Sequence, residues 1–141
     1  MTVRSLQEVE FGAELPTIAV DTSLATVREF VQAIGWDAPR FTDHEAARGE
    51  GLPGALVPGI MSQGFLAATI HSWCPVASIE RIDTVFRAPV LVDQPLTVSA
   101  VVTDIDEDEG VVEVDLTVRT RPPRPGYSGP PSCACQAHLR R

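Results

Sequence analysis

The segment after Pro58, GIMSQGFLAATIHSW (59–73), leaves this chain few ways to fold. Its apolar residues lie on most sides of a helix rather than on one stripe, which is typical of a helix enclosed by other structure. Pro75 ends the helical pattern, and the residues after it alternate with the period of a strand. We therefore predict one long central helix wrapped by a sheet. The apolar residues are Ile60, Met61, Phe65, Leu66, Ala67, Ala68 and Ile70.

The start of this helix is the first candidate for a functional site. The backbone amides of Gly59 and Ile60 precede the first hydrogen-bonded turn, so they are free donors at the positive end of the helix dipole. Such donors suit a carbonyl oxygen that gains negative charge during a reaction. The alternative is that Gly59 only turns the chain.

The residues before the central helix predict shorter elements. A β-like run covers 17–20, and Asp21, Thr22 and Ser23 are candidate caps for an amphipathic helix over 24–34 that ends at Gly35. Asp43 caps a short helix through 45–47. The glycines and prolines of 50–58 indicate a connection.

Four β segments follow the central helix, over 79–86, 96–105, 111–120 and 132–139. The acidic stretch 106–110 ends in glycine and predicts a hairpin turn, whereas the proline-rich stretch 121–131 predicts a stiff excursion. This order predicts an α+β fold, an antiparallel sheet wrapped around the long helix. Because the edge strands of such a sheet need protection, we expect a dimer.

The composition excludes several classes of protein. The 141 residues suit a single domain spanning 1–141. A net charge of −8, with no lysine, leaves no basic surface for nucleic acid or an anionic membrane. No apolar run is long enough to span a membrane and no signal peptide is visible, so we expect a cytoplasmic protein. Cys74, Cys133 and Cys135 lack metal-binding spacing, and we expect no metal and no cofactor.

Three stretches resemble the MaoC-like, hotdog-fold (R)-specific enoyl-thioester hydratases and 3-hydroxyacyl-thioester dehydratases. Residues 35–47 (GWDAPRFTDHEAA) are similar to the family's G-D-x-N-P-I-H-x-D-x-x-x-A, and 57–61 (VPGIM) to its helix start H-G-M. Residues 86–98 (FRAPVLVDQPLTV) are similar to F-x-x-P-V-x-x-G-D-x-L-x-V. The resemblance covers most of the chain and implies a single hotdog domain.

The catalytic part of the motif departs from the family. These enzymes use an aspartate and a histidine that hold one water, but Trp36 and Phe41 occupy those positions here. Asp37 and His44 are the nearest replacements, as a displaced acid/base pair. Alternatively, Asp37 only turns the chain and His44 is an exposed helix residue. The resemblance also implies a substrate-binding wall, formed by Trp36, Phe41, Gly59, Ile60, Met61 and Phe65.

The resemblance implies a component of a hydratase or dehydratase that acts on an acyl-CoA or acyl-carrier thioester. The departures indicate a subunit that lacks the usual Asp/His pair and receives it from a second hotdog subunit in a heterodimer. One alternative is an active homodimeric hydro-lyase that uses Asp37 and His44. Others are a non-catalytic protein that binds an acyl chain or another small apolar ligand and, by fold analogy alone, a thioesterase.

Overall fold

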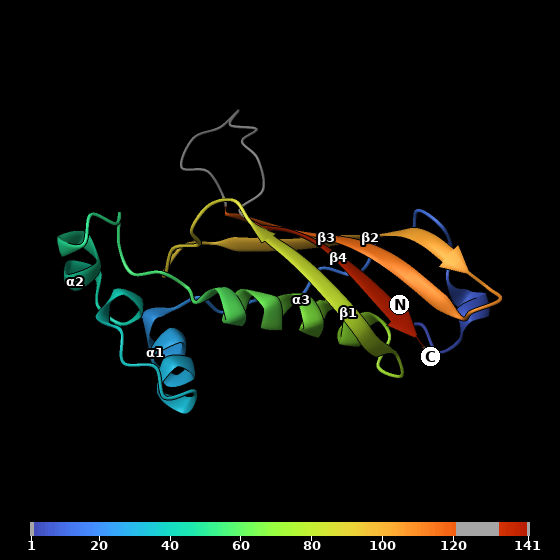
Figure 1. Ribbon diagram of the computed structural model, residues 1–141, viewed down its shortest axis with the longest axis horizontal. Coiled ribbons are helices and arrows are strands. Elements are labelled where there is room, and N and C mark those ends of the chain that lie inside the picture. Colours follow the sequence, from blue (N-terminus) through green and yellow to red (C-terminus); the bar gives the residue numbers. More distant parts are fainter. Residues whose placement is uncertain (1, 121–132, 141) are drawn as a thin grey trace.

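The computed structural model describes residues 2–120 and 133–140 of the chain. Four antiparallel strands form one sheet in the order β1-β4-β3-β2. A long helix, α3 (Gly59–Trp73), lies along one face of this sheet (Figure 1). The predicted α+β architecture is confirmed. The strands are β1 (Ser78–Phe86), β2 (Leu96–Asp106), β3 (Val111–Thr120) and β4 (Cys133–Arg140).

Helix α3 forms the core together with the inner face of the sheet. Leu66 and Ile70 have no exposed surface, and they belong to one cluster with the inward-facing residues of β2 and β3, such as Leu116. The prediction that α3 is enclosed is confirmed only for the side that faces the sheet. The other side of the helix exposes a stripe of apolar and small residues at a spacing of four. The stripe consists of Ile60, Gly64, Ala68 and Ser72.

The sheet has an apolar inner face and a polar outer face. Val112, Val114, Leu116 and Val118 of β3 are all buried, whereas the residues between them are more exposed. Across the outer face, the strand register aligns polar residues of β1, β4 and β3 in rows. One of these rows is Asp83, Gln136 and Asp115. The period-2 alternation in the sequence therefore predicts the faces correctly.

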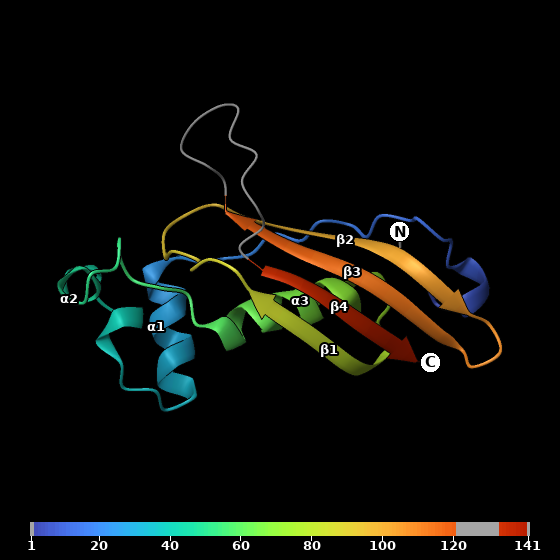
Figure 2. The ribbon, with the colours of Figure 1, turned by 45° about the horizontal axis from the view of Figure 1, so that its top comes forward.

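Three of the smaller helices lie beyond one end of the sheet, whereas the 3-10 helix η1 (Leu6–Glu8) lies at the other end (Figures 1 and 2). The three are α1 (Leu24–Ala33), the 3-10 helix η2 (Pro39–Phe41) and α2 (His44–Gly49). The side chain of Ser23 caps α1 by accepting the amide of Thr26, and the side chain of Asp43 caps α2 by accepting two amides. Gly35 follows α1 with a φ of 71°, the left-handed conformation that glycine adopts at helix ends. These predicted helices and caps are confirmed.

The strand predicted over 17–20 is wrong, because the chain pairs with β2 before that point. Leu15 donates its amide to Ala100, and Val102 donates to the carbonyl of Ala13. No described backbone hydrogen bond joins residues 17–20 to β2, so the pairing ends at Leu15. The β-branched residues after Pro16 suggested a strand, but burial of Leu15 sets the pairing.

Parts of the sequence-based prediction lie outside the described residues. These are the proline-rich stretch 121–131, the first residue of the predicted last strand, Ser132, and the side chains of Cys133 and Cys135. In the part of the chain that is described, no helix combines the length and apolarity needed to cross a membrane.

Candidate functional site

The start of α3 presents two backbone amides without a described acceptor. The carbonyl of Pro58 accepts the amides of Met61 at 3.0 Å and Ser62 at 3.1 Å, which closes the first turn. The amides of Gly59 and Ile60 make no hydrogen bond among the described residues. Both amides therefore stay available to an oxygen that carries negative charge.

Close packing of an aromatic ring explains the glycine at this helix start. A Cβ atom placed on Gly59 would lie 3.1 Å from Cζ of Phe86, at the end of β1. The φ angle of Gly59 is not positive, so the position does not require glycine for a turn. The aromatic ring of Phe86 thus approaches the backbone where a side chain would block it. The resemblance includes Phe86, but sequence reasoning did not place it at the site.

The predicted apolar wall divides into two groups. Met61 is buried, and Phe65 packs partly buried against the core, so both support α3 from the sheet side. Ile60 is 51% exposed beside the free amides. The rings of Trp36 and Phe41 form a separate pair, with centroids 5.6 Å apart and planes at 34°.

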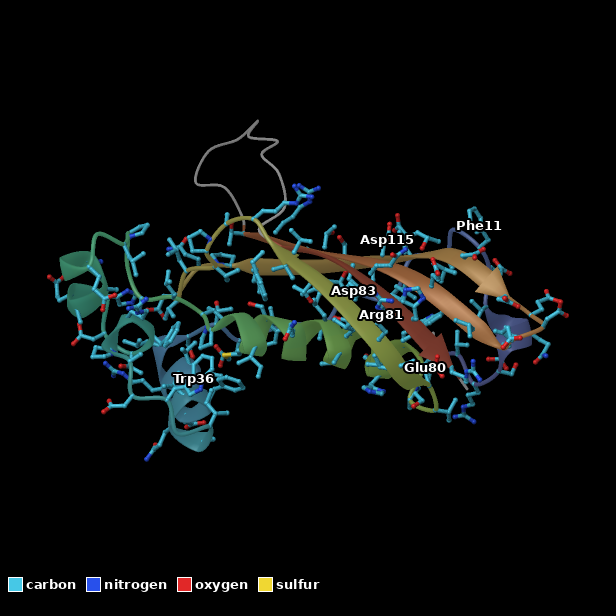
Figure 3. All side chains as sticks on the ribbon, viewed as in Figure 1. Phe11, Trp36, Glu80, Arg81, Asp83 and Asp115 are labelled. Atoms are coloured by element: carbon cyan, nitrogen blue, oxygen red, sulfur yellow. The ribbon has the colours of Figure 1, made fainter. Side chains whose placement is uncertain are left out.

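The Trp36 and Phe41 pair belongs to the end of the molecule that carries α1 (Figure 3). Trp36 is 44% exposed, whereas Phe41 packs against the core. The carbonyl of Arg40 accepts the amide of Leu56 at 2.9 Å, which ties η2 to the segment that leads into α3. The pair is therefore fixed on the approach to the helix start.

The two candidate acid/base residues are not joined to each other. Asp37 is exposed between α1 and η2, and it makes no hydrogen bond or ion pair within the described chain. His44, the first residue of α2, bonds elsewhere through both ring nitrogens. Its Nε2 lies 2.9 Å from Oδ2 of Asp93, and its Nδ1 lies 3.0 Å from the amide nitrogen of Ala55. The predicted Asp37 and His44 pair stays a prediction.

Asp93 is a site residue that sequence reasoning missed as a partner of His44. It lies in the turn between β1 and β2, 49 residues from His44. Its hydrogen bond from His44, followed by one from the amide of Leu24, holds the pKa of its carboxyl below the usual range. The amides of Ala46 and Glu45 lower the pKa of the capping carboxyl of Asp43 in the same way. Both carboxylates are therefore structural anchors.

A shallow depression, with a cavity volume of about 30 Å³, lies at the opposite end of α3 from the free amides. It is lined by residues from the N-terminal segment, the end of α3 and β3 and β4, among them Val3, Trp73, Cys74 and Leu139. Its lining is mostly apolar and carries none of the predicted site residues. Among the side chains of residues 2–120 and 136–140, no three of His, Cys, Asp or Glu gather as a metal-binding group.

Comparison with known proteins finds similarity in the fold but not in the sequence. No protein-family model and no curated protein sequence matches the chain. Solved structures do match. The chain superposes on an (R)-hydratase from A. caviae involved in PHA biosynthesis with a TM-score of 0.84 and 17% identity, over 95% of this chain and 98% of that one.

Two further structures extend this comparison. A chain of the ChsH1-ChsH2 complex from Mycobacterium tuberculosis matches with a TM-score of 0.80 and 18% identity, over 93% of this chain and 97% of that one. A MaoC-like dehydratase matches with a TM-score of 0.84 and 20% identity, over 97% of this chain and 42% of that one. The structural neighbours are thus MaoC-like dehydratases and (R)-hydratases, and this chain has their hotdog fold.

Proposed function

We propose that this chain is a component of a hydratase or dehydratase that acts on an acyl-CoA or acyl-carrier thioester. In this proposal the chain supplies the helix-start amides and part of the acyl-binding wall. A second hotdog subunit supplies the aspartate and histidine that move the protons. The protein is then active as a heterodimer.

The observation that carries this proposal is the bonding of His44. A histidine that acts on a water needs a ring nitrogen free to exchange a proton with it. Both ring nitrogens of His44 are already engaged, one by Asp93 and one by Ala55. Asp37 has no described hydrogen-bond partner that would orient it as a base. Free amides at a helix start, without a free acid/base pair, suit a subunit whose catalytic groups come from its partner.

The open surface of the chain supports a partner at this end of α3. Ile60 and Phe86, which flank the free amides, are 51% and 52% exposed. Ile60 begins the exposed stripe of α3 and Phe86 packs beside Gly59 just before it, while Gly64 and Ala68 further along the stripe permit close approach of another chain. Because burial of apolar surface drives association, we expect the partner to cover them.

The sheet offers a second contact for the partner. At one edge of the sheet, β2 is covered by the segment around Glu14, which forms an antiparallel bridge with Val101. β1 pairs with β4 on one side, and no described segment pairs with its other side. An unpaired strand edge presents amides and carbonyls to another strand. We expect the second hotdog subunit to pair along β1.

The proposed chemistry is the reversible addition of water to an α,β-unsaturated thioester. The base of the partner subunit takes a proton from water, the water oxygen bonds to the β-carbon, and the partner's catalytic pair returns a proton to the α-carbon. Electron density moves onto the thioester oxygen as the first bond forms. Hydrogen bonds from the amides of Gly59 and Ile60 to this oxygen stabilise that charge.

Co-expression with a hotdog protein encoded beside this gene tests the proposal. We expect native mass spectrometry to show a complex of one copy of each chain, and the complex to hydrate a crotonyl thioester. Ile60→Asp in this chain places a charge among the contacts and should prevent assembly, whereas Thr97→Asp, at an exposed position of β2, should not.

A stable homodimer that turns over substrate without the second protein contradicts the proposal. Tight binding of an acyl ligand by an inactive complex would indicate a binding protein instead.

A further inference from the structure

His44 connects segments that lie far apart in the sequence. It begins α2, and its Nε2 lies 2.9 Å from Oδ2 of Asp93 in the turn between β1 and β2. On the other side of the ring, Nδ1 lies 3.0 Å from the amide nitrogen of Ala55, in the connection to α3. A Cβ atom on Gly54 would lie only 3.0 Å from Nδ1. The imidazole therefore packs directly on the backbone that leads into α3.

The two hydrogen bonds of the His44 ring determine which of its nitrogens carries the proton. A backbone amide can only donate, so Nδ1 must accept the hydrogen bond from Ala55 with its lone pair. The proton of the neutral imidazole is then on Nε2, which donates to the carboxylate of Asp93. A doubly protonated ring would lose the bond to Ala55. The geometry thus requires the neutral Nε2–H tautomer.

Asp93 holds an unfavourable backbone conformation to make this contact. Its φ is 63°, and it is the only non-glycine residue with a positive φ among those the structure describes. Such a conformation costs about 1 kcal/mol for a residue with a side chain. The amide of Asp93 donates to the carbonyl of Thr22 at 2.9 Å, and its Oδ1 accepts the amide of Leu24 at 3.0 Å. One carboxylate therefore joins the start of α1 to the start of α2.

The segment held by His44 leads directly to the helix start. Ala55 has no exposed surface, and its carbonyl accepts the amide of Val92 at 2.9 Å. Val57 donates its amide to the carbonyl of Val90 at 2.8 Å. Pro58 follows, and its carbonyl closes the first turn of α3. A shift of Ala55 is therefore transmitted over a short, hydrogen-bonded path to the amides of Gly59 and Ile60.

We infer that His44 and Asp93 are positioning residues, a clamp that fixes residues 54–57 and thereby orients the free amides at the start of α3. In this role neither residue contacts the substrate. This role differs from the acid/base role predicted for His44, which requires a free ring nitrogen. The clamp rests on the geometry alone. Its effect on thioester turnover rests on the proposed function.

Three variants separate the two bonds of His44. His44→Asn keeps an acceptor near the position of Nδ1 and loses the contact with Asp93. His44→Gln keeps a donor near the position of Nε2 and loses the contact with Ala55. Asp93→Asn removes the charge while retaining one acceptor oxygen. His71→Asn, at an exposed histidine of α3, is the matched control.

NMR spectroscopy of the full chain at neutral pH tests the clamp. We expect the ¹⁵N shifts of His44 to show a proton on Nε2 and none on Nδ1. Hydrogen exchange at Ala55 should accelerate roughly tenfold or more in His44→Gln, because its acceptor is lost, and by less in His44→Asn. The amide resonances of Gly59 and Ile60 should move in His44→Gln and stay in place in His71→Asn. A proton on Nδ1, or unmoved Gly59 and Ile60 resonances, would overturn the inference.

Turnover by the assembled complex separates this inference from the proposed function. If the clamp orients the amides for catalysis, His44→Gln should reduce kcat/KM roughly tenfold while binding of the partner is unchanged, and His44→Asn should recover part of the loss. Normal turnover together with displaced Gly59 and Ile60 resonances would support the clamp and contradict the role of these amides in the proposed reaction.

Discussion

At the scale of single residues, the hydrogen-bond partners of a side chain indicate whether it has a structural role or is free to react. His44 and Asp37 are both chemically able to act as acid and base. His44 is fully bonded, to Asp93 and Ala55, whereas Asp37 has no described partner. Residue type alone therefore does not distinguish a side chain that is free to react from one that is held by its neighbours, whereas the hydrogen bonds do.

The lowered pKa of Asp93 predicts how its contribution to stability depends on pH. A carboxyl whose folded pKa lies below its unfolded value of about 3.9 stabilises the folded state above that value, and this contribution is lost as the pH falls through the folded pKa. In urea titrations, the difference in unfolding free energy between the natural chain and Asp93→Asn should be largest near pH 6 and shrink towards pH 3. Asp37→Asn, which changes an unbonded carboxylate, should show a much smaller difference. Equal differences at pH 6 and pH 3 would contradict the role of the hydrogen bonds from His44 and Leu24 in holding this carboxylate.

The approach of Phe86 to Gly59 predicts a coupled pair of mutations. Gly59→Ala forces the ring of Phe86 to move and should cost about 1 kcal/mol or more of unfolding free energy. In a Phe86→Ala background the same change should be close to neutral, which a double-mutant cycle measures. Gly64→Ala is the control, because its Cβ would meet nothing within 4 Å and alanine favours a helix. An unchanged cost without Phe86 would show that the ring is not the cause.

At the scale of elements, helix α3 has a buried inner face and an exposed outer face. Leu66 on its inner face has no exposed surface, and truncation to alanine should cost about 2–5 kcal/mol, whereas Ile60→Asp on the outer face should cost less than about 1 kcal/mol. Denaturant unfolding of the isolated chain measures both. A large loss of stability from Ile60→Asp would mean that the outer face belongs to the core of the single chain.

The elements were predictable where their signal is local. The helical spacing over 24–34, the cap at Asp43 and the alternation after Pro75 all depend on neighbouring residues, and each element is present. The strand predicted over 17–20 failed because β2 pairs with residues before Pro16. The contact between His44 and Asp93 joins residues that are 49 positions apart in the sequence, and it depends on a left-handed backbone conformation at Asp93. No local sequence pattern predicts either feature.

At the scale of the whole molecule, the polar surface and the open apolar surface lie on different sides. The outer face of the sheet carries polar rows such as Asp83, Gln136 and Asp115, which suits contact with water. The outer stripe of α3, with Ile60 at its start, is apolar or small and uncovered. This asymmetry suits a subunit that buries one side against a partner, and we expect that partner to cover the residues around the free amides, which are exposed in the single chain.

Hydration of a crotonyl thioester by the purified chain alone tests the central claim, that this subunit lacks a working acid/base pair. The reaction is followed by loss of the enoyl absorbance at neutral pH. Because His44 is fully bonded, we expect no turnover above the rate in buffer for the natural chain, and no change in His44→Gln. Turnover by the isolated chain that is lost in Asp37→Ala would contradict the claim and assign the chemistry to this chain.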